Sequence, residues 1–433
     1  MKDVLIKRDR YVLTNLKKPT RRGVIWLGQT CNLNCYFCYF AKKIANKNHP
    51  EHPFFSIEKA KEICKVFRDD YDFNSIDIQG GEPTIYPKIF ELIDYCNNIG
   101  LKPSLITNAI ALNNYKFASK FKIHEVYDFL ISLQGIGGNY DKVVGMKGGF
   151  EKQMKALKNL NDLNIPFRIN AVLSKEIIND IDEIASIAIE YGARVVNFIG
   201  YNDTGDQKET RKKDQIPFYS NISDKLSPII DFLESKEIEV NVRFIPFCIF
   251  KKKYRKNIQN FKQMIYDLHE WEKSSRLWID RPSQRRAAEK TEHRPSEMVS
   301  LLKRKISKGD LSFFSNLIKN NRKYVNPYKY QEKIHKNLKY FNPSISFIEG
   351  YTKVEHFYFE MALSYTDKVK VDKCKLCSIN FICDGFHQDL IKEFGDSEVR
   401  PVCLDKNIYD PRYYLNEQLK VVENQELGWF LEE

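Results

Sequence analysis

Three cysteines stand close together early in the chain, Cys31, Cys35 and Cys38 in the segment CNLNCYFC. Gaps of three and two residues are typical of metal ligation. Three thiolates on one tight loop can hold three irons of a cubane [4Fe–4S] cluster and leave the fourth iron open to another ligand. A zinc site that lacks one ligand and a set of buried thiols are the alternatives.

A second group of cysteines lies near the other end of the chain. Cys374, Cys377 and Cys383 follow a CxxC-x5-C spacing. A CxxC pair often binds zinc, so zinc is the alternative to a second iron–sulfur cluster. Four other cysteines complete the inventory: Cys403 and Cys248 near segment ends, and Cys64 and Cys96 in apolar helical patterns, where buried thiols are expected.

Short β-rich runs alternate with helical patterns from Gly23 to about Phe247. Strands are expected at 23–29, 75–79, 103–107, 126–133, 167–173 and 195–200. Six strand–helix units in series predict a parallel α/β sheet with right-handed crossovers, either open or curled into a partial barrel. Ligands of such folds gather at the C-terminal ends of the strands.

Polar and glycine residues stand at those strand ends. They are Gly80, Gly81 and Glu82 after the second strand, Thr107 and Asn108 after the third, Ser132 at the end of the fourth and Asn170 in the fifth. For any single serine or asparagine, ordinary capping of a strand end is the alternative. The whole set, in this order along the chain, is a more specific signal of a binding site than any one of its members.

Together these motifs resemble the radical S-adenosylmethionine (SAM) superfamily. The cysteine loop matches the CxxxCxΦC signature, with Phe37 at the aromatic position. The resemblance implies a partial (βα)6 barrel and a [4Fe–4S] cluster whose open iron chelates the amino and carboxylate groups of SAM. It also implies reductive cleavage of SAM to methionine and a 5′-deoxyadenosyl radical, which abstracts hydrogen from a substrate.

The resemblance also implies roles for the strand-end residues. Glu82 would receive the SAM amino group, with the adjacent glycines permitting close backbone approach. Ser132 would contact the SAM ribose or carboxylate, and Asn170 would act similarly. The chain departs from the family pattern at Ala109, where glycine is usual, and at Gln134, where aspartate is usual. In related enzymes an acidic residue in this region can take part in substrate chemistry, and Gln134 puts that role in doubt here.

The second cysteine group resembles the C-terminal SPASM and twitch extensions, which carry auxiliary [4Fe–4S] clusters. His387 stands where the SPASM pattern has a further cysteine, and no preceding cysteine pair is present, so one auxiliary cluster is expected. Spacing in SPASM relatives favours Cys403 as the fourth ligand, whereas twitch relatives make Cys248 its rival. A cluster with four protein ligands has no open iron, so it would move electrons or shape the site.

Positive charge is concentrated in one segment. Residues 251–345 hold 24 lysine and arginine residues against nine acidic ones, whereas the whole chain has a net charge of +12. The segment is either a solvated helical face or a surface for an acidic, phosphorylated or sugar-linked substrate. Nucleic acid is a weaker alternative, because no known module is present. Asp267, His269 and Glu270 would reach the active site only if their helix folds back, so a surface role is favoured.

Four parts are expected: an N-terminal extension (1–22), the core barrel (23–247), a basic, mainly helical insertion (248–345), and a hairpin at about 345–370 followed by a small cluster-binding domain (346–433). No apolar run is long enough to span a membrane, and no secretory signal is visible at the N-terminus. We therefore expect a cytoplasmic protein without a membrane partner.

The leading hypothesis is hydrogen abstraction from a peptide or protein residue, because SPASM-type relatives commonly modify peptides. The alternative is the same chemistry on a carbohydrate or another small polar metabolite. A non-catalytic iron–sulfur or nucleic-acid-binding protein is a remote third possibility. An electron donor such as flavodoxin or ferredoxin is expected in the first two cases.

Overall fold

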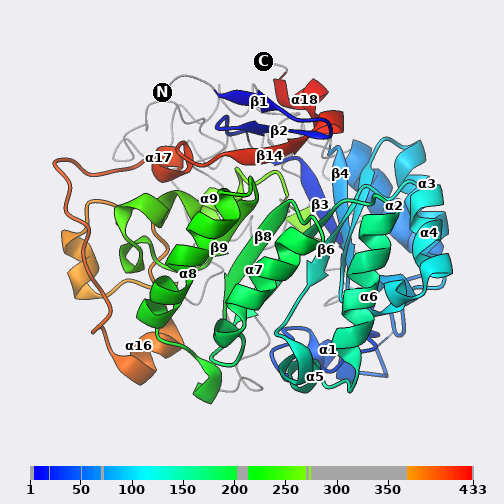
Figure 1. Ribbon diagram of the computed structural model, residues 1–433, viewed down its shortest axis with the longest axis horizontal. Helices are drawn as coiled ribbons and strands as arrows, with labels where there is room; N and C mark the ends of the chain where they lie inside the picture. The colour runs from blue at the N-terminus through cyan, green and yellow to red at the C-terminus, as the bar shows by residue number, and fades with distance from the viewer. Residues whose placement is uncertain are drawn as a thin grey trace, which may run out of the picture.

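The computed structural model describes residues 4–18, 20–49, 51–69, 73–201, 213–269, 273–274 and 368–431. A curled parallel sheet of nine strands forms its centre, in the order β10-β9-β8-β7-β6-β5-β4-β3-β11 (Figure 1). The strands are β3 (Arg22–Trp26), β4 (Ser75–Gln79), β5 (Lys102–Thr107), β6 (Asp128–Ser132), β7 (Phe167–Leu173), β8 (Val195–Gly200), β9 (Glu239–Arg243), β10 (Ile258–Gln259) and β11 (Lys273–Ser274).

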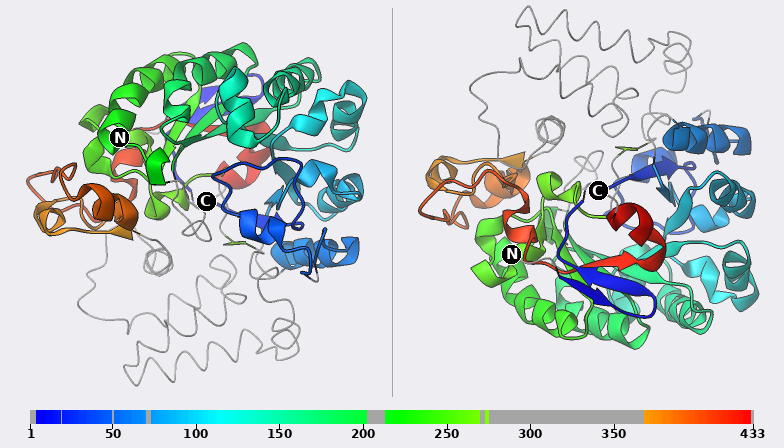
Figure 2. Two further views of the ribbon diagram at one scale, coloured as in Figure 1. Left: turned by 90° about the horizontal axis from the view of Figure 1, so that it is seen from below. Right: turned by 90° about the horizontal axis from the view of Figure 1, so that it is seen from above.

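Helices cover the outer face of the curled sheet (Figures 1 and 2). They are α2 (Ile57–Asp69), α3 (Ile89–Asn98), α4 (Tyr115–Ile123), α6 (Gly149–Asp162), α7 (Ile181–Glu190) and α8 (Tyr219–Glu234). Each buries an apolar stripe at helical spacing, as Ala156, Leu157 and Leu160 do on α6. Among the described residues, no helix is both long and apolar enough to cross a membrane.

All six predicted strands are present. The predictions for 167–173 and 195–200 match β7 and β8, whereas the first strand ends at Trp26 because the chain then turns toward the cysteine loop. The sequence missed β9. The strand signal was present, because Val240 and Val242 alternate with Glu239, Asn241 and Arg243. Unlike the polar face of an ordinary surface strand, these polar side chains are buried.

The two ends of the chain meet over the N-terminal end of the barrel. Strands β1 (Leu5–Lys7), β2 (Tyr11–Thr14) and β14 (Lys420–Glu423) form an antiparallel sheet, which lies at the top of Figure 1. Leu13 and Val421 pack with Val195 at the start of β8. The helix α18 (Leu427–Leu431) follows β14.

Short elements make up the described part of the C-terminal region: β12 (Lys368–Val369), β13 (Phe386–His387), α16 (Gln388–Phe394) and α17 (Arg412–Leu415). The predicted hairpin at 345–370 lies almost wholly outside the described residues, as do Glu270 and most of the basic insertion. The helix expected to carry Asp267, His269 and Glu270 is not found in its described part. There α9 spans only Phe261–Met264, one turn with an Asn260–Gln263 capping box.

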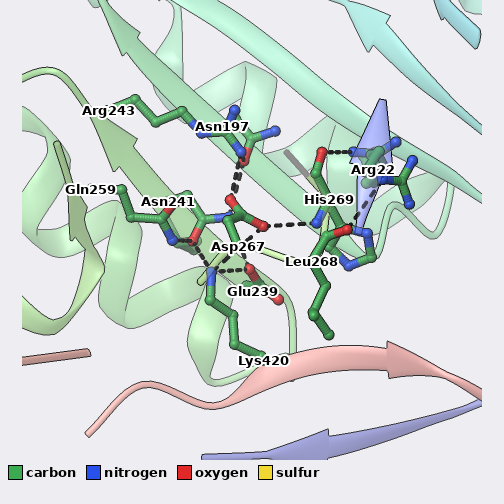
Figure 3. Close-up of polar contacts among 12 residues, drawn as sticks. Arg22, Asn197, Glu239, Asn241, Arg243, Gln259, Asp267, Leu268, His269 and Lys420 are labelled. Atoms are coloured by element: carbon green, nitrogen blue, oxygen red, sulfur yellow. Dashed lines mark hydrogen bonds and ion pairs between the residues drawn. The ribbon is translucent and has the colours of Figure 1, made fainter. Parts of the chain in front are cut away.

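Asp267 and His269 lie neither on the surface nor at the active site, the two places considered from the sequence. Both are buried at the N-terminal end of the barrel, away from the cysteine loop. Arg243 donates to Asp267 at 2.7 Å, and the backbone N–H of His269 donates to the same carboxylate at 3.0 Å (Figure 3). Charged partners inside the barrel therefore stabilise the burial of Asp267, which explains why this polar segment leaves the surface.

Candidate active site

The cysteine loop begins five residues after β3 and lies against α5 (Gly137–Val144). The backbone N–H groups of Asn34 and Tyr36 donate to the carbonyls of Val144 at 3.0 Å and Val143 at 3.3 Å. All three cysteines are half-buried. Burial raises the pKa of Cys31 to about 12. The thiols would therefore bind iron by exchanging their protons for metal, which makes loading pH-dependent.

The two glycines after β4 let the next loop lie directly on the cysteine loop. Gly80 and Gly81 adopt positive φ angles of 105° and 59°. A Cβ on Gly80 would lie 2.7 Å from the Leu27 nitrogen, and a Cβ on Gly81 would collide with the Thr30 carbonyl. The next backbone N–H, that of Glu82, donates to Thr30 at 2.8 Å. The glycines are therefore required by the contact between the two loops.

Glu82 connects the ends of β4 and β5. Its carboxylate is buried and accepts four hydrogen bonds: from the Thr84 backbone (3.0 Å) and hydroxyl (2.6 Å), the Thr107 hydroxyl (2.5 Å) and the Asn108 backbone (2.8 Å). Three of these reach Oε1 and one reaches Oε2, so Oε2 retains capacity for another donor. Burial raises the pKa of Glu82, while these hydrogen bonds act in the opposite direction.

Two residues that the sequence did not single out complete this frame. The Asn108 amide donates to Asn32 in the cysteine loop at 2.7 Å. Gln153, fully buried on α6, donates to the carbonyls of Asn108 at 3.0 Å and Ser132 at 2.8 Å. The sequence offered one signal of this bridging role of Gln153, namely a polar residue on the apolar stripe of α6.

Ser132 and Asn170 are register partners on β6 and β7, so their side chains project from the same face of the sheet. The amide oxygen of Asn170 is buried without a hydrogen-bond partner in the described structure. Gln134 instead bonds the backbone of β7, donating to Asn170 at 3.1 Å and accepting from Val172 at 2.9 Å. Ala109 adopts a left-handed φ of 61°, which explains why glycine is usual there.

A second constellation of thiols surrounds a cavity in the C-terminal region. Cys248, Cys374, Cys377 and Cys383 all line it. Burial, followed by the proximity of the other three cysteines, raises the pKa of Cys248 to about 12. Cys403 is exposed and is absent from the cavity lining. The structure thus groups the cysteine trio with Cys248, the reverse of the preference from spacing.

An all-sulfur donor set around a cavity suits an iron–sulfur cluster and also a tetrahedral zinc ion. Within the described ranges, no three histidine, cysteine or acidic side chains already converge on one metal-ion position. The Val402 backbone N–H donates to the Cys377 sulfur at 3.3 Å, as is common around iron–sulfur clusters. His387 lies outside the cavity lining and accepts a hydrogen bond from the Asp389 backbone at the start of α16.

Comparison with known proteins identifies the part of the chain that carries the first site. Residues 27–199 match the Radical SAM superfamily. These residues form a radical SAM enzyme domain. The chain is 30% identical over 173 residues to mycofactocin maturase MftC of Mycolicibacterium smegmatis, covering 39% of this chain and 41% of the relative. It is 28% identical over 195 residues to the AdoMet-dependent heme synthase of Methanosarcina barkeri, covering 43% of this chain and 53% of the relative.

Among solved structures, Streptococcus suis SuiB bound to precursor peptide SuiA matches with a TM-score of 0.42 and 22% identity, over 52% of this chain and 48% of that one. The matched region thus spans about half the length of these proteins. The radical SAM domain contains the cysteine loop and every strand-end residue named above, whereas all four cavity cysteines lie outside it.

Proposed function

We propose that the chain reductively cleaves SAM and uses the resulting 5′-deoxyadenosyl radical to abstract hydrogen from a substrate. The observation that carries this proposal is the continuous hydrogen-bonded frame that joins the cysteine loop to the strand ends. It runs from Asn32 through Asn108 to Glu82. A [4Fe–4S] cluster held by Cys31, Cys35 and Cys38 would supply the electron that cleaves the sulfonium. The frame keeps the loop and the SAM-binding strand ends in register with each other.

The residues take the following roles in this proposal. Cys31, Cys35 and Cys38 hold the first cluster. Contacts to SAM are assigned to Phe37, Gly80, Gly81, Glu82, Thr107, Asn108, Ser132 and Asn170. The Oε2 atom of Glu82 and the unpartnered Oδ1 atom of Asn170 are acceptors suited to a cationic or hydroxyl-bearing ligand.

An auxiliary cluster on Cys248, Cys374, Cys377 and Cys383 belongs to the same proposal. The cavity that these thiols share supports Cys248 over Cys403 as the fourth ligand. Four protein ligands would leave no open iron, so this cluster would transfer electrons rather than bind substrate. The core barrel at 23–247 and a cluster-binding region after the insertion remain our domain assignment.

A peptide or protein residue is the proposed substrate, since SPASM-type proteins, which the second cysteine group resembles, commonly modify peptides. The solved structure of SuiB with a precursor peptide is in keeping with this class. A small-molecule substrate is the second candidate, favoured by the similarity to an enzyme named as a heme synthase. A flavodoxin or ferredoxin is proposed as electron donor.

Electron paramagnetic resonance tests whether SAM binds the first cluster. The Cys248→Ala, Cys374→Ala double variant should retain only the first cluster, so its reduced spectrum is free of overlap. Adding SAM should change that spectrum, because SAM occupies the open iron. An identical spectrum with and without SAM would refute the proposed site.

Fractionated cell extract tests the substrate class. Extract from the native host is divided by ultrafiltration, and each fraction is assayed for stimulation of 5′-deoxyadenosine formation. A peptide substrate predicts stimulation that protease treatment of the fraction abolishes. Stimulation that survives protease and passes a small-pore membrane would favour the small-molecule alternative.

A further inference from the structure

A tyrosine hydroxyl is buried beside the first cysteine loop without a hydrogen-bond partner. Tyr140 lies on α5 and is fully buried. Its hydroxyl oxygen has no partner among the described residues. Buried polar groups nearly always have a partner, so this hydroxyl is expected to bind an acceptor that the protein's own atoms do not supply.

The helix α5 holds Tyr140 against the cysteine loop, at the lower end of the barrel in Figure 1. Tyr140, Val143 and Val144 form the buried stripe of this helix, at the i, i+3 and i+4 spacing that puts side chains on one face. The carbonyls of Val143 and Val144 accept from the backbone N–H groups of the two residues that flank Cys35. The part of the loop that carries Cys35 is therefore fastened to the helix that carries Tyr140.

Packing fixes the ring of Tyr140 in this position. A Cβ on Gly149, at the start of α6, would lie 3.1 Å from the Cε1 atom of the ring, so the glycine leaves the room that the ring fills. The ring of Phe150 packs on it with centres 6.0 Å apart. The hydroxyl is therefore held in one direction within the core.

Negative charge near the hydroxyl indicates that direction. Burial raises the pKa of Tyr140, and a thiolate at Cys35 raises this pKa further, ahead of Glu82, Asp141 and Cys31. Because the effect of a charge weakens with distance, this order indicates that the hydroxyl faces Cys35. The unpartnered donor and the cysteine loop thus lie on the same side of α5.

We propose that the Tyr140 hydroxyl donates a hydrogen bond to a sulfur of the first cluster, on the side of Cys35, and thereby raises the cluster's reduction potential. The inference rests on the proposed function, because it requires a cluster on Cys31, Cys35 and Cys38. A phenol hydroxyl is a donor, and hydrogen bonds to the sulfurs of an iron–sulfur cluster tune its potential. Reduction adds negative charge to the cluster, so a donor that faces a sulfur stabilises the reduced state more than the oxidised state.

Tyr127 offers a matched control. Its hydroxyl is also buried and has no partner among the described residues. Tyr127 precedes β6, at the end of the barrel opposite the cysteine loop, where the Nζ atom of Lys102 lies 5.3 Å from its ring centre. Tyr127→Phe therefore removes the same atom as Tyr140→Phe, but far from the first cluster.

A redox titration followed by electron paramagnetic resonance tests the inference. It uses the Cys248→Ala, Cys374→Ala background without SAM, so that only the first cluster is observed. Tyr140→Phe should shift the midpoint potential to a more negative value. At the midpoint potential of the background protein, the ratio of reduced to oxidised cluster should fall about fivefold, as expected for one lost hydrogen bond. Tyr127→Phe should leave this ratio unchanged.

Equal midpoint potentials in Tyr140→Phe and in the background protein would overturn the inference. So would an equal shift in Tyr127→Phe, because the effect would then come from the loss of any buried hydroxyl. A background protein that binds no iron–sulfur cluster on Cys31, Cys35 and Cys38 would instead show that the proposed function itself has failed.

A second measurement keeps the hydroxyl in place, so it does not depend on how well the Tyr140→Phe variant folds or binds its cluster. A single fluorotyrosine replaces Tyr140 or, as the control, Tyr127. Electron–nuclear double resonance of the reduced first cluster should detect the fluorine at the first position and not at the second, because the coupling falls steeply with distance. A cluster-loaded protein without fluorine coupling from the first position would contradict contact between Tyr140 and the cluster.

Discussion

At the scale of single residues, side chains that bond the backbone hold the active-site frame together. Gln153 illustrates this, because one buried amide group satisfies the carbonyls at the ends of β5 and β6. Glu82 plays a similar part between β4 and β5. Substitutions here should therefore act on SAM binding through position as well as through contact.

Gln153→Met should weaken SAM binding and lower stability by about 1–3 kcal/mol, because it leaves two buried carbonyls without donors. Titration calorimetry with SAM and denaturant unfolding measure the two effects. Gln425→Met, at an exposed position, is the matched control. Wild-type SAM affinity in the Gln153 variant would exclude the positioning role.

Cys248→Ala should lose the auxiliary cluster, whereas Cys403→Ala should keep it. The reason is that Cys248 shares the thiol-lined cavity and Cys403 lies on the surface. Iron content, measured in a background without Cys31, Cys35 and Cys38, should fall from about four to near zero only for Cys248→Ala. The opposite result would restore Cys403 as the ligand.

The candidate ligands could be predicted from spacing, but their grouping could not. Cys374 and Cys248 are more than a hundred residues apart, and only the folded chain brings them to one cavity. The roles of Asn32 and Gln153 were hidden for a related reason. Their partners are backbone carbonyls and an amide on other elements, which leave no local pattern.

At the scale of elements, α8 connects the barrel to the C-terminal region. Glu398 accepts from the backbone N–H groups of Tyr219 at 3.0 Å and Ser220 at 2.7 Å, at the start of α8. Phe218 and Phe394 pack with ring centres 4.4 Å apart beside this contact. A negative side chain from the C-terminal region thus caps a helix of the barrel.

Glu398→Ala should destabilise this junction by about 1 kcal/mol, as expected for a lost helix cap. Hydrogen exchange should speed up in the first turn of α8 and leave α3 unchanged. Glu393→Ala, an exposed change on α16, is the control. Equal protection of α8 in the two variants would show that the cap does not hold the junction.

Element predictions succeeded for the strands β3 to β8, even though Asp77, Asp128 and Arg168 lie buried on three of them. The missed strand β9 also alternates, with Val240 and Val242 between polar residues. The helix predicted after it is limited to the single turn α9, where the buried Lys262 and Gln263 donate to carbonyls of the C-terminal region. Burial of charge depends on distant partners, which a single sequence does not display.

At the scale of the whole molecule, charged side chains fill the barrel at the end opposite the cysteine loop. Arg168 donates to Asp128 at 2.7 Å, Arg22 to Asp77 at 2.8 Å and Lys420 to Glu239 at 2.7 Å, with every partner buried. Lys420 comes from β14, so this network joins the C-terminal strand to the barrel (Figure 3).

Asp128→Asn should lower the free energy of unfolding by about 3–5 kcal/mol, because it removes the nearer charged partner of the buried Arg168 and leaves only Asp77, at 3.8 Å. Asp162→Asn removes an exposed pair with Lys158 and should change stability by less than about 0.5 kcal/mol. Chemical denaturation measures both changes. Similar effects of the two substitutions would refute the buried network as a source of stability.

The same pair predicts a dependence on pH. Burial alone would raise the pKa of Asp128, but Arg168 and Arg22 lower it well below its usual range. A depressed carboxyl pKa gives stability that is present at neutral pH and is lost as pH falls below about 4. Between about pH 6 and about pH 3, the free energy of unfolding should therefore fall more in the wild type than in the Asp128→Asn variant. If the free energy of unfolding falls equally with pH in the two proteins, this prediction is wrong.

Release of 5′-deoxyadenosine tests the central claim most directly. The reconstituted wild type, with dithionite and SAM, should release it even without substrate. The Cys31→Ala, Cys35→Ala, Cys38→Ala variant should release none while retaining about four of about eight irons. A fully iron-loaded wild type that leaves SAM intact, or a triple variant that still cleaves it, would contradict the assignment of radical SAM chemistry to this cysteine loop.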